Sequence, residues 1–255
     1  MSDANFYSIN ERRNHVRGCV LWVFSNSCLP WFREIAYCLS GAKMILEDQK
    51  RIIEVYNSSA KKYADRCYHE LDYKPLDRLL LDRFSELIPP NGLICDIGCG
   101  PGEIADYLHK KEIRVIGIDI ADKMIEEAQR LNPNIQFRVD NMLYLAIPDS
   151  YFSGICSFYA IVNYDYDTVI DILREYYRVL KKNGILFLTF HAEEKIVHTD
   201  DFFESGKSLD FYYFESDRII RFLQETGFEI REALIRYPYT EEYPSKRAYI
   251  ICEKQ

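Results

Sequence analysis

The sequence predicts an α/β fold with a doubly wound, mostly parallel sheet. From residue 93 to the C-terminus, strand-like apolar segments alternate with segments of helical apolar spacing, the pattern of successive βαβ units. A glycine-rich turn at residues 98–102 follows the first of these strands and directly precedes a helix. Such a turn lets the backbone approach a ligand, and the free N–H groups at the helix start favour a polar or anionic group. We therefore expect a ligand site at the carboxyl ends of the strands.

The elements expected from apolar spacing and breaker residues form a regular series. Two helices precede the sheet, over Ile45–Cys67 and Leu76–Ile88, and the second ends at Pro89-Pro90. Strands are expected near residues 93–97, 114–119, 135–139, 152–158, 184–190, 228–236 and 246–252. The later helices are expected near residues 103–110, 122–131, 166–180 and 216–226. Asn183-Gly184 is interpreted as the end of a helix, and the last two strands as an antiparallel hairpin.

The domain organisation follows from these elements. Residues 1–43 are predicted to be a poorly ordered extension, and residues 44–255 one domain. Within it, residues 44–90 form a helical cap and residues 91–255 an α/β core with an insertion at 192–215. The apolar run Cys19–Phe24 is too short to cross a bilayer, and no small-residue cleavage site follows it. A targeting role for this segment is one alternative to an unstructured extension, and a lid or dimer contact made by Trp22, Trp31 and Phe32 is another.

Composition narrows the classes of partner. The net charge of −8 and a pI near 5.3 argue against a nucleic acid held by bulk electrostatics. The eight cysteines form no C-x-x-C pair and show no metal-ligand spacing. We therefore expect reduced core cysteines in a cytoplasmic protein, without a membrane or a metal. Asp165 and Asp167 could attract a cation, but no third ligand matches them.

The form of the glycine turn selects among nucleoside cofactors. The dinucleotide fingerprint is G-x-G-x-x-G, whereas here the third glycine falls one residue early, at Gly102, and no P-loop lysine follows. The seven residues Asp96-Ile97-Gly98-Cys99-Gly100-Pro101-Gly102 resemble the first motif of class I S-adenosylmethionine (SAM) methyltransferases. The resemblance extends from about residue 52 to the C-terminus. It implies a Rossmann-like, seven-stranded sheet whose last strand is antiparallel. For the glycine turn itself, the alternative to a SAM site is the cofactor site of a nicotinamide enzyme.

The resemblance also assigns cofactor residues. Asp119 ends the second strand, 21 residues beyond Gly98, where the family's carboxylate holds the ribose hydroxyls. Asp140 follows the third strand, where the family's acid accepts a bond from the adenine amino group; a turn cap is the alternative. Met124 either packs on the adenine or belongs to the core, and Tyr63 either reaches the SAM carboxylate or belongs to the core of the cap. The full predicted set is Tyr63, Asp96, Gly98, Cys99, Gly100, Gly102, Asp119, Ile120, Met124, Asp140, Asn141 and Met142.

Two residues are candidates for the chemistry itself. SAM carries an activated methyl group, so the protein must hold the acceptor in line with the S–CH₃ bond and exclude water. His191, at the end of the fifth strand, is the candidate base or orienting group because imidazole titrates near neutrality. A histidine bonded only to backbone or water is the alternative. Tyr159, after the fourth strand, is the second candidate, or it packs against the cofactor.

The acceptor is constrained mainly by absences. The loop after the fourth strand lacks the Asn/Asp-Pro-Pro-Tyr/Phe signature of adenine or glutamine methylation. Aromatic residues at 202–203 and 211–214 could line an apolar pocket, form a strand on the sheet, or pair two subunits as a homodimer. The leading hypothesis is SAM-dependent methylation of a small molecule at O, N or C, which releases S-adenosylhomocysteine. The alternatives are a tRNA-base methyltransferase and a non-catalytic SAM-binding regulatory protein.

Overall fold

The computed structural model describes the backbone of residues 29–255 and the side chains from residue 47 onward. The chain divides into two compact units, residues 1–50 and 51–255. The prediction of a poorly ordered extension falls largely on residues outside the described part. So does the alternative contact by Trp22, Trp31 and Phe32, whose side chains are not among those described. The domain boundary at residue 44 therefore stays a prediction.

A seven-stranded sheet forms the centre of the larger unit. Its strands are β1 (Leu93–Ile97), β2 (Arg114–Asp119), β3 (Gln136–Val139), β4 (Phe152–Phe158), β5 (Leu180–Ala192), β8 (Phe228–Arg236) and β9 (Lys246–Lys254). They lie in the order β3-β2-β1-β4-β5-β9-β8, and only β9 runs antiparallel to its neighbours. The central strands β1 and β4 are apolar runs buried along nearly their whole length, as expected where helices cover both faces. The predicted sheet and its antiparallel last strand are confirmed.

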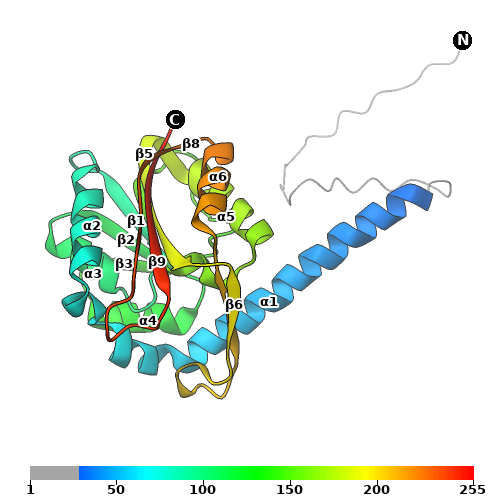
Figure 1. Ribbon diagram of the computed structural model, residues 1–255, viewed down its shortest axis with the longest axis horizontal. Coiled ribbons are helices and arrows are strands. Elements are labelled where there is room, and N and C mark those ends of the chain that lie inside the picture. Colours follow the sequence, from blue (N-terminus) through cyan, green and yellow to red (C-terminus); the bar gives the residue numbers. More distant parts are fainter. Residues whose placement is uncertain (1–28) are drawn as a thin grey trace, which may run out of the picture. The chain divides into compact units, whose positions relative to one another are not determined.

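Helices cover the two faces of this sheet. One core cluster joins the sheet to α2 (Pro75–Glu86), α3 (Glu103–Lys110) and α4 (Asp122–Leu131). On the other side lie α5 (Tyr166–Val179) and α6 (Ser216–Thr226), as Figure 1 shows. Three 3-10 helices complete the unit: η1 (Glu70–Tyr73), η2 (Ala160–Asn163) and η3 (Phe202–Glu204).

The cap helix α1 (Leu29–Cys67) begins earlier than the apolar spacing predicted and ends where it predicted. Its residues 51–67 belong to the larger unit. They lie beside a two-stranded antiparallel ribbon formed by β6 (Lys195–Thr199) and β7 (Leu209–Tyr213) (Figure 1). Ion pairs join α1 to the insertion, with Arg51 Nη2 2.7 Å from Asp210 Oδ2 of β7 and Lys62 Nζ 2.9 Å from Glu204 Oε2 of η3, between the two strands. The insertion therefore folds on itself as a ribbon against the cap.

One predicted helix end is wrong. α5 ends at Val179, and Leu180 already pairs with Phe152 as the first residue of β5. Asn183, with φ at 60°, and Gly184 instead lie within the irregular first part of β5. Asn183 does adopt the left-handed conformation that is typical of a helix C-cap. Here it lies where the register of β5 against β4 shifts, and not at a helix end.

Within residues 29–255, every helix is too short or too polar to cross a bilayer. Among the described residues, no three His, Cys, Asp or Glu side chains are grouped so that they could hold a metal ion.

Candidate functional site

The turn after β1 packs so closely against its neighbours that Gly98 has no room for a side chain. Gly98 has φ at 72°, and a Cβ there would lie 2.4 Å from the Cβ of Ala160. The backbone N–H groups of Gly98 and Cys99 both donate to the carbonyl of Ile118, at 2.7 and 3.0 Å. Only glycine fits this position, because any side chain meets η2 and the positive φ penalises all other residues. The turn therefore packs tightly against η2, and its close approach to a ligand stays a prediction.

Asp119 fixes the same turn from the end of β2. Its Oδ2 accepts from the N–H of Gly100 at 3.0 Å, and its Oδ1 accepts from the N–H of Ala121 at 2.8 Å. Burial raises the pKa of this carboxyl above its ordinary value. A carboxylate has about four lone-pair positions, so these two bonds leave room for ligand hydroxyls on each oxygen.

Two further carboxyl groups lie beside the turn, and burial disfavours the ionised form of each. Asp96 is buried and accepts from the N–H of Ala105 at 3.1 Å, and burial raises its pKa to about 8. Glu103, the first residue of α3, accepts from the N–H of Leu71 at 2.8 Å, and burial raises its pKa to about 8 as well. Glu103 thereby ties the cap to the helix that follows the glycine turn.

Met124 and Tyr63 meet under the cap. Met124 is 1% exposed and clusters with Ala60 and Ala121, and the rings of Tyr56 and Tyr63 pack against this cluster. Met124 is thus a core residue, whereas Tyr63 is half-buried and also lines the cavity described below. Contact with a bound adenine or carboxylate stays a prediction.

The loop after β3 holds itself together. Asp140 Oδ1 accepts from the N–H of Asn141 at 2.9 Å, and its Oδ2 accepts from the N–H of Ala146 at 3.1 Å. Met142 is buried and its sulfur accepts from the hydroxyl of Tyr176 at 3.6 Å. Asp140 therefore acts as the turn cap that was weighed against a ligand role, and the ligand role stays a prediction.

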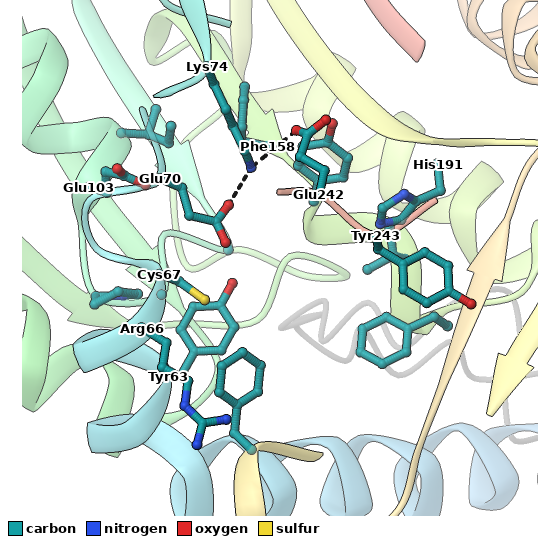
Figure 2. A pocket seen from close by; sticks show the side chains of 18 of the residues that line it. Tyr63, Arg66, Cys67, Glu70, Lys74, Glu103, Phe158, His191, Glu242 and Tyr243 are labelled. Carbon is teal, nitrogen blue, oxygen red and sulfur yellow. Dashed lines mark hydrogen bonds and ion pairs between the residues drawn. The ribbon is translucent and has the colours of Figure 1, made fainter. Parts of the chain in front are cut away.

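A single cavity of about 530 Å³ brings together part of the predicted set. The predicted residues that line it are Tyr63, Asp96, Gly98, Cys99, Gly100, Tyr159 and His191. Those absent from its lining are Gly102, Asp119, Ile120, Met124, Asp140, Asn141 and Met142. We call the part lined by Asp96 and Gly98–Gly100 the glycine end. Figure 2 shows Glu103 and Cys67 on one side of the cavity, with His191 and Tyr243 on the other.

The tail end is the part of the cavity lined by Lys74, His191, Tyr213, Glu242, Tyr243 and Arg247. His191 Nδ1 lies 2.8 Å from Ser245 Oγ, and its ring stacks on Tyr213 with centroids 4.5 Å apart. Burial, together with the nearby charges of Arg247 and Lys74, lowers the pKa of His191 to about 3. His191 is therefore a neutral imidazole at physiological pH, oriented by Ser245.

Tyr159 lies beside His191, with ring centroids 5.0 Å apart. Its φ of 55° is left-handed, and its N–H donates to Thr189 Oγ1 at 3.0 Å. Burial raises the pKa of its hydroxyl well above the ordinary value, so Tyr159 stays protonated. It can donate or pack at the cavity wall, but it does not supply a base.

Sequence reasoning missed a buried ionic network behind the tail end. Glu242 accepts two bonds from Arg236, at 2.6 and 2.8 Å, and lies 3.6 Å from Lys74 Nζ. Burial alone would raise the pKa of Glu242, but the bonds from Arg236 hold it at about 2. Arg236 also reaches Asp77 of α2 at 2.9 Å. The only sequence signal was the density of charged and aromatic residues over 236–247.

The ribbon and the cap close over the cavity with aromatic rings. Tyr63 lies 4.9 Å from Phe203 and 6.1 Å from Phe202 between ring centroids. Both phenylalanines line the cavity, together with Phe211 and Tyr213 of β7. Of the alternatives left open for this aromatic segment, the structure shows the pocket lining, while the pairing of two subunits stays untested.

These features define a Rossmann-like domain with a glycine-turn cofactor site that opens into an aromatic cavity. Residues 94–184 match a family model described as a methyltransferase domain. The resemblance to class I SAM methyltransferases that the motifs predicted is confirmed over this segment.

Relatives and solved structures agree with this class. The chain is 32% identical over 114 residues to YqeM of Bacillus subtilis (strain 168), which is named as a provisional methyltransferase. The aligned segment covers 43% of this chain and 46% of YqeM. It thus spans under half of that relative's length. A malonyl-[acyl-carrier protein] O-methyltransferase from Enterobacter lignolyticus (strain SCF1) is 24% identical over 153 residues, 58% of this chain and 57% of the relative.

Two solved structures share the fold. A SAM-dependent methyltransferase from Methanosarcina mazei has a TM-score of 0.61 at 22% identity, over 66% of this chain and 95% of that one. The magnesium protoporphyrin IX methyltransferase from Synechocystis PCC 6803, solved with bound SAM, has a TM-score of 0.62 at 17% identity, over 82% and 97%. Both matches show that the chain shares the fold of these methyltransferases.

Proposed function

We propose that this protein binds SAM at the glycine end and transfers its methyl group to a small-molecule acceptor at the tail end. The observation that carries the proposal is the single cavity of about 530 Å³ that joins the glycine turn to a ring-lined compartment. Binding pockets for small molecules have about this size. The compartment is walled by the cap, the ribbon and the loop before β9, which favours a small acceptor over a folded nucleic acid.

The residues at the glycine end fit a nucleoside cofactor. Gly98 and Gly100 line this end of the cavity without side chains. Their N–H groups are bonded within the turn, to Ile118 and Asp119, so the turn is held in shape before a ligand binds. Asp119 holds the turn in shape and retains lone pairs for hydroxyl groups. SAM supplies, when bound, a methyl group already activated on a sulfonium. The work left to the chain is positioning and the exclusion of water.

The tail end supplies orientation rather than strong base catalysis. His191 is neutral and is held by Ser245, so it can accept or donate one hydrogen bond with its other ring nitrogen. Tyr159, Tyr213 and Tyr243 provide apolar walls beside it. Packing of these rings around an acceptor would exclude water during transfer.

A methyl-transfer screen tests the proposal. Labelled SAM is incubated with the full chain and either small-metabolite pools or RNA, and the labelled product is sought in each fraction. We expect label in the small-molecule fraction. Label in RNA alone would replace the proposal by the tRNA-base alternative, and SAM binding without any transfer would favour the regulatory one.

His191→Ala sharpens the role of the tail end in the same assay. We expect turnover to fall about tenfold or more, the loss of one useful catalytic hydrogen bond, while SAM affinity stays unchanged. Asp217→Ala on the exposed first turn of α6 is the control. Unchanged turnover of His191→Ala would remove His191 from the site.

A further inference from the structure

The wall of the tail end carries an arginine with unused hydrogen-bonding capacity. Arg247 is only 4% exposed, and its Nη1 donates to the backbone carbonyls of Tyr243, at 3.0 Å, and Ser245. Its Nε lies 3.2 Å from Glu242 Oε1 but has no hydrogen-bond acceptor among the described residues. A buried guanidinium is costly unless its donors are matched. Arg247 lines the cavity, so a ligand can supply the missing acceptor after a small movement of the side chain.

A second buried cation lies at the same wall. Lys74 is 6% exposed and pairs with Glu70 and, at 3.6 Å, with Glu242. Glu242 is already held by two bonds from Arg236 and one from the N–H of Tyr239 at 2.8 Å. Glu70 is therefore the main counter-ion of Lys74, and one third of its side chain is exposed. Glu70 is the member of this pair that can turn away into solvent.

Glu241 also lines the cavity but is exposed to solvent, whereas the buried polar groups of this wall favour a ligand that accepts hydrogen bonds. Glu242 is taken up by its arginine partners, whereas Lys74 and Arg247 are donors only. His191 and Tyr213 present a stacked pair of rings beside them. The tail end thus combines buried donors of positive charge with a flat apolar wall.

We propose that the tail end binds the carboxylate of a small acceptor that has an apolar, ring-containing body, with Arg247 and Lys74 holding the carboxylate. This proposal rests on the proposed function, since it names the acceptor class of the same cavity. The planar guanidinium matches a carboxylate, and Glu70 gives up Lys74 when the ligand enters. The apolar body lies against His191, Tyr213 and Tyr243.

Three compounds with one body and different head groups test the charge directly. They are 3-phenylpropionate, its amide and 3-phenylpropylamine, titrated by calorimetry into the full chain saturated with S-adenosylhomocysteine. We expect the carboxylate to bind at least tenfold more tightly than either other compound. Equal binding of the three, or tighter binding of the amine, would overturn the proposal.

Matched variants locate the site. Arg247→Gln should weaken 3-phenylpropionate about tenfold or more, the loss of one charge-assisted bond. Glu70→Gln should strengthen it, because Lys74 loses its competing partner. Arg174→Gln, at an exposed ion pair on α5, should leave it unchanged. If Arg247 and Glu70 had only structural roles, the two substitutions would not change the affinity for 3-phenylpropionate in opposite directions.

The two proposals fail in distinguishable ways. If S-adenosylhomocysteine does not bind, the proposed function fails before any acceptor is tested. If it binds and the carboxylate shows no preference, only the acceptor class is wrong. Should Arg247→Gln fail to fold by thermal melting, Glu70→Gln decides the matter, because its side chain is partly exposed and an unchanged affinity would contradict the proposal.

Discussion

The two ends of the cavity are built in different ways. The glycine end comes from one continuous segment, Asp96 to Gly100, and presents mostly backbone. The tail end is assembled from side chains of the cap, the end of β5, the ribbon and the loop before β9. A site made of backbone needs glycines at fixed spacing and is visible in the sequence. A site made of distant side chains becomes visible only when the chain is folded.

The ionic network behind the tail end shows the difference most clearly. Asp77 accepts from the hydroxyl of Tyr249 at 2.9 Å across 172 positions of sequence. Arg236 links the same carboxylate to Glu242. These contacts fix the loop that carries Tyr243, and the start of β9 with Arg247, against the cap, so the tail end depends on them for its shape.

The largest effect is expected from Arg236→Met, which breaks this network. It leaves Asp77 and Glu242 buried without their main partner, which typically costs about 3–5 kcal/mol of unfolding free energy. Urea unfolding measures the loss. In protein that remains folded, we expect S-adenosylhomocysteine affinity to be kept while acceptor turnover falls.

The control is Arg174→Met, whose own side chain is exposed and whose partner Asp171 is half-buried, so only a few tenths of a kcal/mol should change. If Arg236→Met weakened the cofactor as much as the acceptor, the two ends would not be independent.

Gly98→Ala attacks the glycine end alone. A Cβ at this position lies 2.4 Å from Ala160, and φ is 72°. We expect a loss of S-adenosylhomocysteine affinity of about a hundredfold, together with about 1–3 kcal/mol of strain in the folded state. Calorimetry and urea unfolding measure the two effects.

Gly206→Ala is the matched control, because Gly206 has the same φ of 72° and nothing within 4 Å of an added Cβ. It carries the conformational penalty without the collision. Equal effects of the two substitutions would show that close approach at Gly98 is unimportant.

The buried carboxyl group of Asp96 at the glycine end should make the free energy of unfolding depend on pH. The folded-state pKa of Asp96 is raised to about 8 by burial, above its unfolded value. The contribution of the protonated Asp96 to the free energy of unfolding is thus fully present below about pH 4 and is lost as the pH rises through 8. Each pKa unit corresponds to about 1.4 kcal/mol.

Asp96→Asn keeps an acceptor for the N–H of Ala105 and removes the titration. Its unfolding free energy, measured in urea without cofactor, should fall less between pH 5 and pH 8 than that of the natural chain. An identical slope in both proteins would show that Asp96 is not held as a buried acid.

The sequence predicted the frame well because local signals agreed with the final fold. The strand at 93–97 and the helices at 103–110, 122–131 and 216–226 match β1, α3, α4 and α6. Asn183-Gly184 was misread because a positive φ serves a strand irregularity as readily as a helix end. The ribbon was left open, since its pairing depends on contacts with the cap.

The cavity lining was predicted at the glycine motif and at three separate residues, Tyr63, Tyr159 and His191. Gly98, Gly100 and Asp96 line the cavity as expected, whereas Asp119 and Asp140 are occupied with backbone N–H groups. Lys74 and Arg247 were missed because a lone basic residue in a helical cap or a strand usually points to solvent. Nothing in the local sequence of either residue indicates burial.

The most direct test of the central claim is calorimetry of the full chain with SAM, S-adenosylhomocysteine and NAD. We expect the first two to bind and NAD to give no signal. Asp119→Ala should weaken SAM by about tenfold or more, because the turn loses two charge-assisted hydrogen bonds. Binding of NAD in place of SAM, or SAM affinity untouched by Asp119→Ala, would contradict the assignment of the glycine end.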